Sequence, residues 1–152
     1  MPVKPEFNSL VNLSELQDYN VKTFGEYIQI VDKNGFYTNK QIIQWSKSIG
    51  GYLSHLGIGL NKNVAMCLKL TPSAFATMPG IWRAGATAVS IHSKLASQQI
   101  LEILEITKAE VLFIDQDKWI NLKDEAAKLS SLKKIVLVGG ADSNCVSFAD
   151  IL

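Results

Sequence analysis

The chain has 152 residues, 47% hydrophobic and 19% charged, so it is long enough to bury a core as one domain without disulfides or metals. Fifteen basic and 14 acidic side chains leave a formal net charge of +1 with no block of like charges, which argues against a nucleic-acid or anionic-lipid partner. No apolar run approaches the roughly 20 residues of a membrane-spanning helix, and the start, MPVKPEFNSL, does not resemble a signal peptide.

The two cysteines, Cys67 and Cys145, have no spacing that suits a zinc site or a disulfide framework. Such cysteine usage is typical of a reducing compartment. We therefore expect the protein to be cytoplasmic.

The first 37 residues predict an arm followed by a hairpin. Residues 1–22 show no sustained period; Leu10, Leu13 and Leu16 are compatible with a short helix, but the pattern favours an N-terminal arm ahead of a single α/β domain at 23–152. Residues 26–31 then alternate, and Asn-Gly at 34–35 precedes a second short apolar run. Asn-Gly between two such runs is typical of a β-hairpin with a type I′ turn.

The clearest helix begins after Thr38. Thr38 and Gln41 have the spacing of a capping box, and Gly57 stands where a C′ glycine ends a helix. Gly50 and Gly51 in its interior each cost about 0.8–1 kcal/mol relative to alanine. Close packing of a neighbouring element would explain them. The apolar residues that predict the helix recur at spacings of three and four: Ile42, Trp45, Ile49, Leu53 and Leu56.

The next segments predict a loop, a buried strand and a helix. GIGLNK, from Gly57, follows a helix and lacks a third glycine, so it is interpreted as a helix cap and loop and not as a phosphate-binding turn. NVAMCLKL at 63–70 is typical of a strand buried on both faces, and Cys67 within it is interpreted as a core residue whose thiol pKa is raised by burial.

Thr71 and Pro72 are expected to cap and open a helix that runs to Arg83. Pro79 and the following glycine should kink or interrupt this helix, and Gly85 should end it.

The rest of the chain alternates between buried runs and amphipathic segments. Together with the strand at 63–70, this predicts three or four parallel strands with crossover helices on both faces, a three-layer, Rossmann-like α/β fold with an N-terminal antiparallel hairpin. The expected elements are strands at 86–91, 110–114 and 134–138, helices at 96–108 and 117–132, and the first turn of a helix at 147–152.

Several of these segments, taken in order and spacing, carry a family resemblance. The helix after Thr38, the strand NVAMCLKL, TPSAFATMPGIWRAG, ATAVSIHSKLASQQILEILEITKAEVLFI and KKIVLVGG resemble the N-terminal part of the AMP-forming acyl-CoA synthetase and adenylating-enzyme superfamily. The resemblance runs from about residue 36 to residue 138, with SFADIL similar to the start of the family's next helix. It departs from the family at Ser90 and Ser93, where many members have prolines.

The resemblance implies part of an ATP-dependent ligase that activates a carboxylic acid as an acyl-adenylate and transfers it to a thiol. ATP, Mg²⁺ and CoA or phosphopantetheine are implied for the complete family enzyme and none of them for this chain. The 152 residues contain no G-x-x-x-x-G-K-S/T run and no comparable Ser/Thr/Gly/Lys phosphate loop. We therefore expect a portion that ends before the phosphate loop and is not active alone, and we assign no catalytic, cofactor-binding or metal-binding residue.

The remaining polar residues favour structural or solvated roles. His92, Ser93 and Lys94 cluster after a predicted strand, where ligands of open parallel sheets gather, but loop solvation is the preferred interpretation. Arg83 is expected to interact with helix-terminal carbonyls. His55, Glu102 and Glu105 are interpreted as solvated side chains.

Three functions stay open from the sequence. The leading one is a scaffold within such a synthetase, packed against its remaining subdomains. The second is a stand-alone, noncatalytic interaction module of the same fold, and the third is a small flavodoxin-like nucleotide binder. Because the last predicted helix is cut short and a partner subdomain is expected to be missing, we expect an exposed apolar surface that drives self-association or partner binding.

Overall fold

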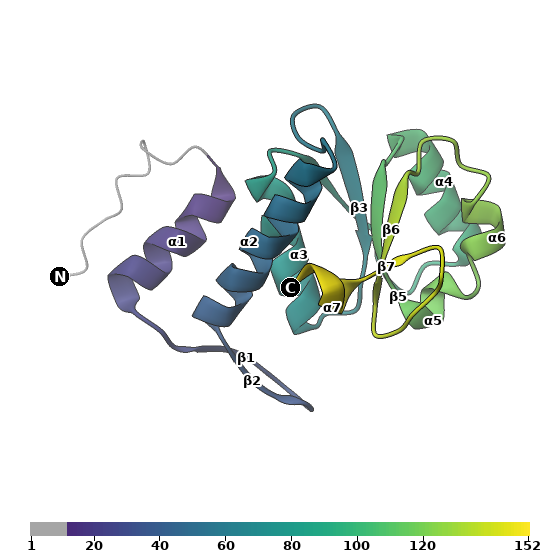
Figure 1. Cartoon of the computed structure of the whole chain (residues 1–152). Helices are drawn as coiled ribbons and strands as arrows, with labels where there is room; N and C mark the ends of the chain where they lie inside the picture. The colour runs from purple at the N-terminus through teal and green to yellow at the C-terminus, as the bar shows by residue number, and fades with distance from the viewer. Residues whose placement is uncertain (1–11) are drawn as a thin grey trace.

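The computed structural model describes residues 12–152 as an α/β protein in three layers. A five-stranded sheet lies in the middle, with helices on both of its faces, and a small hairpin projects from the N-terminal side (Figure 1). The predicted fold class is confirmed. No helix among the described residues is both long and apolar enough to span a membrane.

All five strands of the sheet run parallel, in the order β4-β3-β5-β6-β7. The four predicted strands are present, but β7 escaped prediction because two residues carry no period. The bounds are β3 Asn63–Cys67, β4 Thr87–Ser90, β5 Val111–Asp115, β6 Lys134–Val138 and β7 Val146–Ser147.

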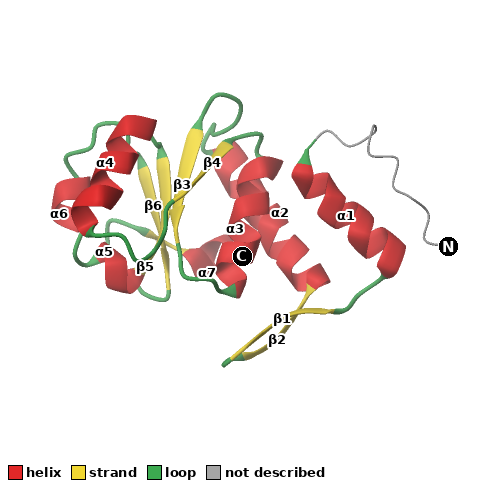
Figure 2. Cartoon of the chain, turned by 180° about the vertical axis from the view of Figure 1, so that it is seen from behind, coloured by secondary structure: helices red, strands yellow, loops and turns green. Residues whose placement is uncertain are grey.

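Alternate side chains of the central strands pack into two separate hydrophobic cores, one on each face of the sheet. Val64, Phe113 and Val136 face the helices drawn on the left of Figure 1, which are α2 (Asn39–His55), α3 (Pro72–Arg83) and α7 (Phe148–Ile151). Ala65, Leu112 and Leu137 face α4 (Ser97–Thr107), α5 (Gln116–Trp119) and α6 (Lys123–Ala126) on the opposite side (Figure 2). This alternation explains why β5 is buried along its whole length.

The predicted hairpin is confirmed, with β1 (Ile28–Asp32) antiparallel to β2 (Gly35–Thr38). The predicted type I′ turn is wrong, because neither Lys33 nor Asn34 between the paired ends has a positive φ. Instead, the Asp32 carboxylate accepts a 2.7 Å hydrogen bond from the Asn34 amide, and Gly35 alone takes a positive φ, of 139°. An aspartate that bonds to the backbone two residues on offers another way to close a turn.

Helix α2 begins and ends as predicted. The Thr38 hydroxyl accepts from the Gln41 amide, the Gln41 side chain accepts from the Thr38 amide, and Gly57 follows with φ of 72°. Close packing does explain Gly50, since a Cβ placed there would lie 2.8 Å from Arg83 Cβ on α3. It does not explain Gly51, where such an atom would meet nothing within 4 Å.

A regular helix, α1 (Leu13–Phe24), occupies the second half of the segment predicted as an arm. The short helix that Leu13 and Leu16 allowed is therefore present; Leu10 lies outside the described residues. The local sequence pattern did not predict this helix, because the contacts that stabilise it are made with a residue far along the chain, on α3. The predicted boundary between arm and domain stays a prediction.

The predicted interruption of α3 at Pro79 is also wrong, because the helix is continuous from Pro72 to Arg83. Proline removes one backbone hydrogen bond, but Gly80 packs directly against Ile49 of α2, and this tertiary contact stabilises the helix on both sides of Pro79. Pro72 opens the helix as expected, and Gly85 ends it with φ of 77°. The Thr71 hydroxyl makes no cap and donates instead to the Lys69 carbonyl.

The helix predicted at 117–132 is two short helices, α5 and α6, joined by a turn. Trp119, Leu122 and Ala126 are buried as the period required. The chain nevertheless turns between them, and the Asn121 side chain donates to the Asp117 carbonyl, a local bond that competes with helix continuation.

Candidate functional site at the carboxyl edge of the sheet

The topology of the sheet places a crevice between β3 and β5. After β3 the chain passes to α3 on one face, and after β5 it passes to α5 and α6 on the other face. Because β3 and β5 are neighbours, their outgoing segments separate at the carboxyl edge. Ligands of open parallel sheets bind at such a switch point.

A pocket of about 370 Å³ lies at this switch point. Its walls come from the carboxyl ends of three adjacent strands, β3, β5 and β6, and from the segments that follow them. We call it the switch-point pocket, and its lining residues are Lys69, Asp115, Gln116, Asp117, Ile120, Val138 and Gly139.

Lys69 and two aspartates link the two sides of the crevice. The Lys69 amide donates to Asp115 Oδ2 over 2.6 Å, and the Lys69 ammonium donates to Asp117 Oδ2 over 2.7 Å. Both bonds join residues 46 or 48 positions apart, so they fix the segment after β3 against the segment after β5.

The two carboxylates of the pocket have opposite electrostatic surroundings. Asp115 is buried, and burial raises the pKa of its carboxyl, although the hydrogen bond from the Lys69 amide acts against that rise. Asp117 is exposed, and the hydrogen bond from Lys69 lowers the pKa of its carboxyl. The same bond raises the pKa of the Lys69 ammonium. The Lys69 ammonium therefore pairs with the Asp117 carboxylate, whereas the buried Asp115 carboxyl accepts from the Lys69 backbone amide.

Gln116 adds another acceptor beside Asp115. Its Oε1 atom is buried without a hydrogen-bond partner among the described residues. Its side chain lies so close to Gly140 that a Cβ on that residue would collide with it. Gly140, which follows β6, thus leaves space for the glutamine side chain.

This geometry suits a ligand that donates hydrogen bonds or carries positive charge. Two carboxylates and an amide oxygen outnumber the single ammonium, and that ammonium is already paired. Within residues 12–152 no group of three histidine, cysteine, aspartate or glutamate side chains is arranged to hold a metal ion. The pocket can therefore fix the two loops and accept donors, but it lacks the cationic cradle that a phosphate needs.

The polar cluster singled out from the sequence lies elsewhere. His92 follows the edge strand β4, is exposed, and accepts a hydrogen bond from the Lys94 amide at Nδ1, as in a solvated loop. His55, Glu102 and Glu105 are also exposed, as expected. The absence of assigned catalytic, cofactor and metal residues stays a prediction.

Cys67 lies in the core beneath this edge. Its side chain is fully buried, and burial raises the pKa of its thiol to about 11. The interpretation of Cys67 as a core residue is confirmed.

Arg83 has the expected structural role, but a different partner from the predicted one. Its guanidinium binds both carboxylate oxygens of Asp18 on α1, each over 2.8 Å, and not the terminal carbonyls of its own helix. The sequence could not reveal this pair, because 65 positions separate the two residues.

The pocket residues were also missed, although one local signal was available. Lys69 and Asp115 are the polar residues that end two continuous apolar runs, AMCLK and VLFID. Buried parallel strands that end in charged residues point to the carboxyl edge.

A family model places this fold among known proteins. The model for the AMP-binding enzyme family matches residues 18–149, which is most of the chain. The chain belongs to the AMP-binding enzyme family. The predicted resemblance is thereby confirmed.

The curated relatives of this chain are much longer proteins. It is 26% identical over 153 aligned residues to 4-hydroxybenzoate-CoA/benzoate-CoA ligase of Rhodopseudomonas palustris, covering 100% of this chain and 28% of the relative. It is 27% identical over 100 residues to a plipastatin synthase protein of Bacillus subtilis, covering 66% of this chain and 4% of the relative.

Solved structures with the same fold are also longer chains. An anthranilate CoA ligase in complex with anthranoyl-AMP superposes with a TM-score of 0.86 at 23% identity, over 92% of this chain and 27% of that chain. This likeness shows the fold. The chain thus spans little more than a quarter of the length of these two CoA ligases.

Proposed function

We propose that this chain is the N-terminal portion of an ATP-dependent, AMP-forming ligase that activates a carboxylic acid as an acyl-adenylate for transfer to a thiol. The carrying observation is the family match over residues 18–149, combined with coverage of only 28% of the CoA ligase relative. The relatives named as CoA ligases favour CoA as the thiol, and the plipastatin synthase relative keeps a carrier-protein thiol as the alternative.

This portion contributes a structural framework to the ligase. The two cores fix β3, β5 and β6 in register, and the Lys69 bonds to Asp115 and Asp117 hold the loops at their carboxyl ends. A rigid edge of this kind can wall an acyl or nucleotide site that other parts of a ligase complete.

The switch-point pocket does not fit the phosphates of ATP. Transfer at the α-phosphate requires groups that neutralise the negative charge developing on its oxygens. The pocket instead presents a buried carboxylate, an unpartnered amide oxygen and a lysine already paired with Asp117. We therefore derive no step of the adenylation from its residues, and in this proposal ATP, Mg²⁺ and the thiol bind to groups supplied by the rest of the ligase.

The partner of this portion is the remainder of the synthetase. Leu70, beside the pocket residue Lys69, is 86% exposed, and Ile120 in the pocket wall is 57% exposed. Apolar side chains beside a site at the sheet edge are suited to a packed subdomain interface. We therefore expect the isolated chain to self-associate through the same side chains. The cytoplasmic location stays a prediction.

Pyrophosphate release tests the proposal. The purified chain, supplied with ATP, Mg²⁺, CoA and benzoate or a panel of other carboxylic acids, should release no pyrophosphate above the protein-free control. A full-length benzoate CoA ligase assayed in parallel shows that the conditions support turnover. Robust release by the 152-residue chain would contradict the framework role.

A stand-alone, noncatalytic interaction module of the same fold is the second candidate, favoured by the exposure of Leu70 and Ile120. The nucleotide sequence after the codon for Leu152 separates the two candidates. A continuing frame with a Ser/Thr/Gly/Lys phosphate loop supports the ligase, and a natural stop codon supports the module. The flavodoxin-like binder loses its support, because the family match accounts for the same strands and helices.

A further inference from the structure

Helix α1 is attached to the body of the protein mainly by polar contacts. Ser14 is the only buried residue within Leu13–Phe24, while Leu13 and Phe24 are 61% and 60% exposed. A helix that packs on a core normally buries an apolar stripe. The attachment of α1 must therefore depend on specific polar bonds.

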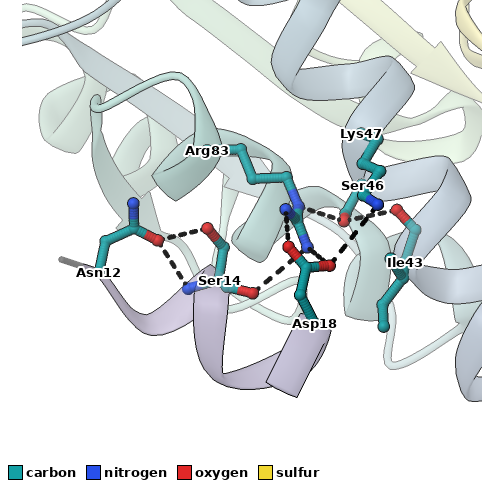
Figure 3. A network of polar contacts seen from close by, with 7 residues as sticks. All are labelled: Asn12, Ser14, Asp18, Ile43, Ser46, Lys47 and Arg83. Carbon is teal, nitrogen blue, oxygen red and sulfur yellow. Dashed lines mark hydrogen bonds and ion pairs between the residues drawn. The ribbon is translucent and has the colours of Figure 1, made fainter. Parts of the chain in front are cut away.

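Those bonds converge on one guanidinium (Figure 3). Arg83 Nη1 and Nη2 each donate to one oxygen of the Asp18 carboxylate over 2.8 Å, and Nη2 also donates to the Ser14 carbonyl over 3.3 Å. Lys47 of α2 lies 3.8 Å from the same carboxylate. A bidentate arginine–carboxylate pair is among the stronger polar contacts in proteins.

The guanidinium is held in place without help from α1. Arg83 Nε donates over 2.8 Å to Ser46 Oγ, a fully buried hydroxyl, which in turn donates to the Ile43 carbonyl of α2. The Arg83 side chain is only 13% exposed. The Arg83 Nη1 and Nη2 groups and the Lys47 ammonium thus form an oxyanion site on α2 and α3, and Asp18 is its occupant within the same chain.

A fixed point lies at the other end of α1. Gly25 ends the helix with φ of 76°, and its carbonyl accepts a 3.0 Å bond from the buried Asn39 side chain. The same Asn39 side chain accepts from the Tyr27 amide over 3.1 Å. The segment from Gly25 to Tyr27 is therefore pinned to the start of α2. Around the far end, a pocket of about 400 Å³ lies between α1 and the Gly50-Gly51 region of α2.

We propose that α1 is a strap that opens about the pinned Gly25–Tyr27 segment, and that its opening frees the Arg83–Ser46–Lys47 site for the carboxylate of another molecule. The strap opens by exchanging its polar bonds with α2 and α3 for bonds with water, and Leu13 and Phe24 of the helix are already exposed before it opens. The hinge stays attached through Asn39. The body of the protein stays folded, because both hydrophobic cores exclude the residues of α1.

Hydrogen exchange on the full chain tests the strap. In the unmodified protein, amides of α1 should exchange faster than those of α2 and β5, because local opening is less costly than global unfolding. Asp18→Asn replaces one of the two acceptors by a donor that faces the guanidinium, and should speed exchange in α1 by roughly tenfold to a hundredfold. Exchange in α2 and β5 should not change. Asp124→Asn on the exposed surface of α6 is the matched control and should leave α1 unchanged.

The released site is tested with the Asp18→Asn variant and acetate, followed through the NMR signal of Arg83 Nε–H. Acetate should shift that signal saturably, chloride at equal ionic strength should not, and the additional change Arg83→Lys should abolish the response. A short peptide with one aspartate among alanines tests the same carboxylate on a polypeptide. Equal exchange of α1 in Asp18→Asn and the unmodified protein would overturn the strap, and an Arg83 signal unmoved by both carboxylates would overturn the binding site.

Discussion

Two adjacent glycines of α2 should respond differently to the same substitution by alanine. Gly50 and Gly51 both lie inside the helix, where alanine is favoured over glycine by about 0.8–1 kcal/mol. Their surroundings differ. A Cβ at Gly50 would lie 2.8 Å from Arg83 Cβ and 3.2 Å from the Gly80 carbonyl oxygen of α3, whereas a Cβ at Gly51 would enter open space.

The expected free energies follow from this geometry. Gly51→Ala should raise the free energy of unfolding by about 1 kcal/mol, the propensity gain alone. Gly50→Ala makes the same gain but must force α2 and α3 apart, and inserting a methyl group into a packed contact costs about 1–3 kcal/mol. The two variants should therefore differ by that cost, with Gly51→Ala the more stable.

Urea unfolding followed by the fluorescence of the three tryptophans measures both variants against the unmodified protein. Similar slopes of free energy against urea would show that the same structure unfolds in each case. If Gly50→Ala proved as stable as Gly51→Ala, the close approach of α2 and α3 at this point would be refuted.

Two further predictions concern the carboxyl edge and the core beneath it. Because burial raises the pKa of the Asp115 carboxyl, the folded state holds its proton more tightly than the unfolded state, and the contribution of Asp115 to stability falls as pH rises through the usual aspartate range of about 4. The stability of Asp115→Asn relative to the unmodified protein should thus rise with pH in urea melts, and a difference independent of pH would contradict the burial. Cys67 is buried, and its thiol pKa is raised to about 11, so iodoacetamide at about pH 8 should alkylate it only as the protein unfolds. Mass spectrometry measures the alkylation. Rapid alkylation of the native protein would instead show an accessible thiolate.

Features set by neighbouring residues could be predicted from the sequence. The Thr38 capping box depends on a partner three positions away, and the central strands β3, β5 and β6 are recognisable in the sequence as continuous apolar runs. The family resemblance followed from the order of the same elements. In each case a local bond or an unbroken pattern carried the information.

Features set by distant residues could not be predicted in this way. The Asp18–Arg83 pair attaches α1 to α3, yet the two residues lie 65 positions apart in the sequence. Without knowledge of this pair, the α1 sequence is only a weakly periodic segment. Gly80 against Ile49 keeps α3 continuous through Pro79, which local propensity alone would interrupt. The switch-point pocket needs three loops brought together by strand order, and strand order is a property of the whole sheet.

The central claim, that this portion of an AMP-binding enzyme supplies framework without a phosphate site, is tested most directly by ATP binding. ATP with Mg²⁺ can be titrated into the chain, labelled with ¹⁵N, up to about 1 mM, near the upper end of typical enzyme KM values. The amide signals of Lys69, Asp115 and Gln116 should show no saturable shift. A saturable shift at these amides would place the nucleotide in the switch-point pocket and contradict the account.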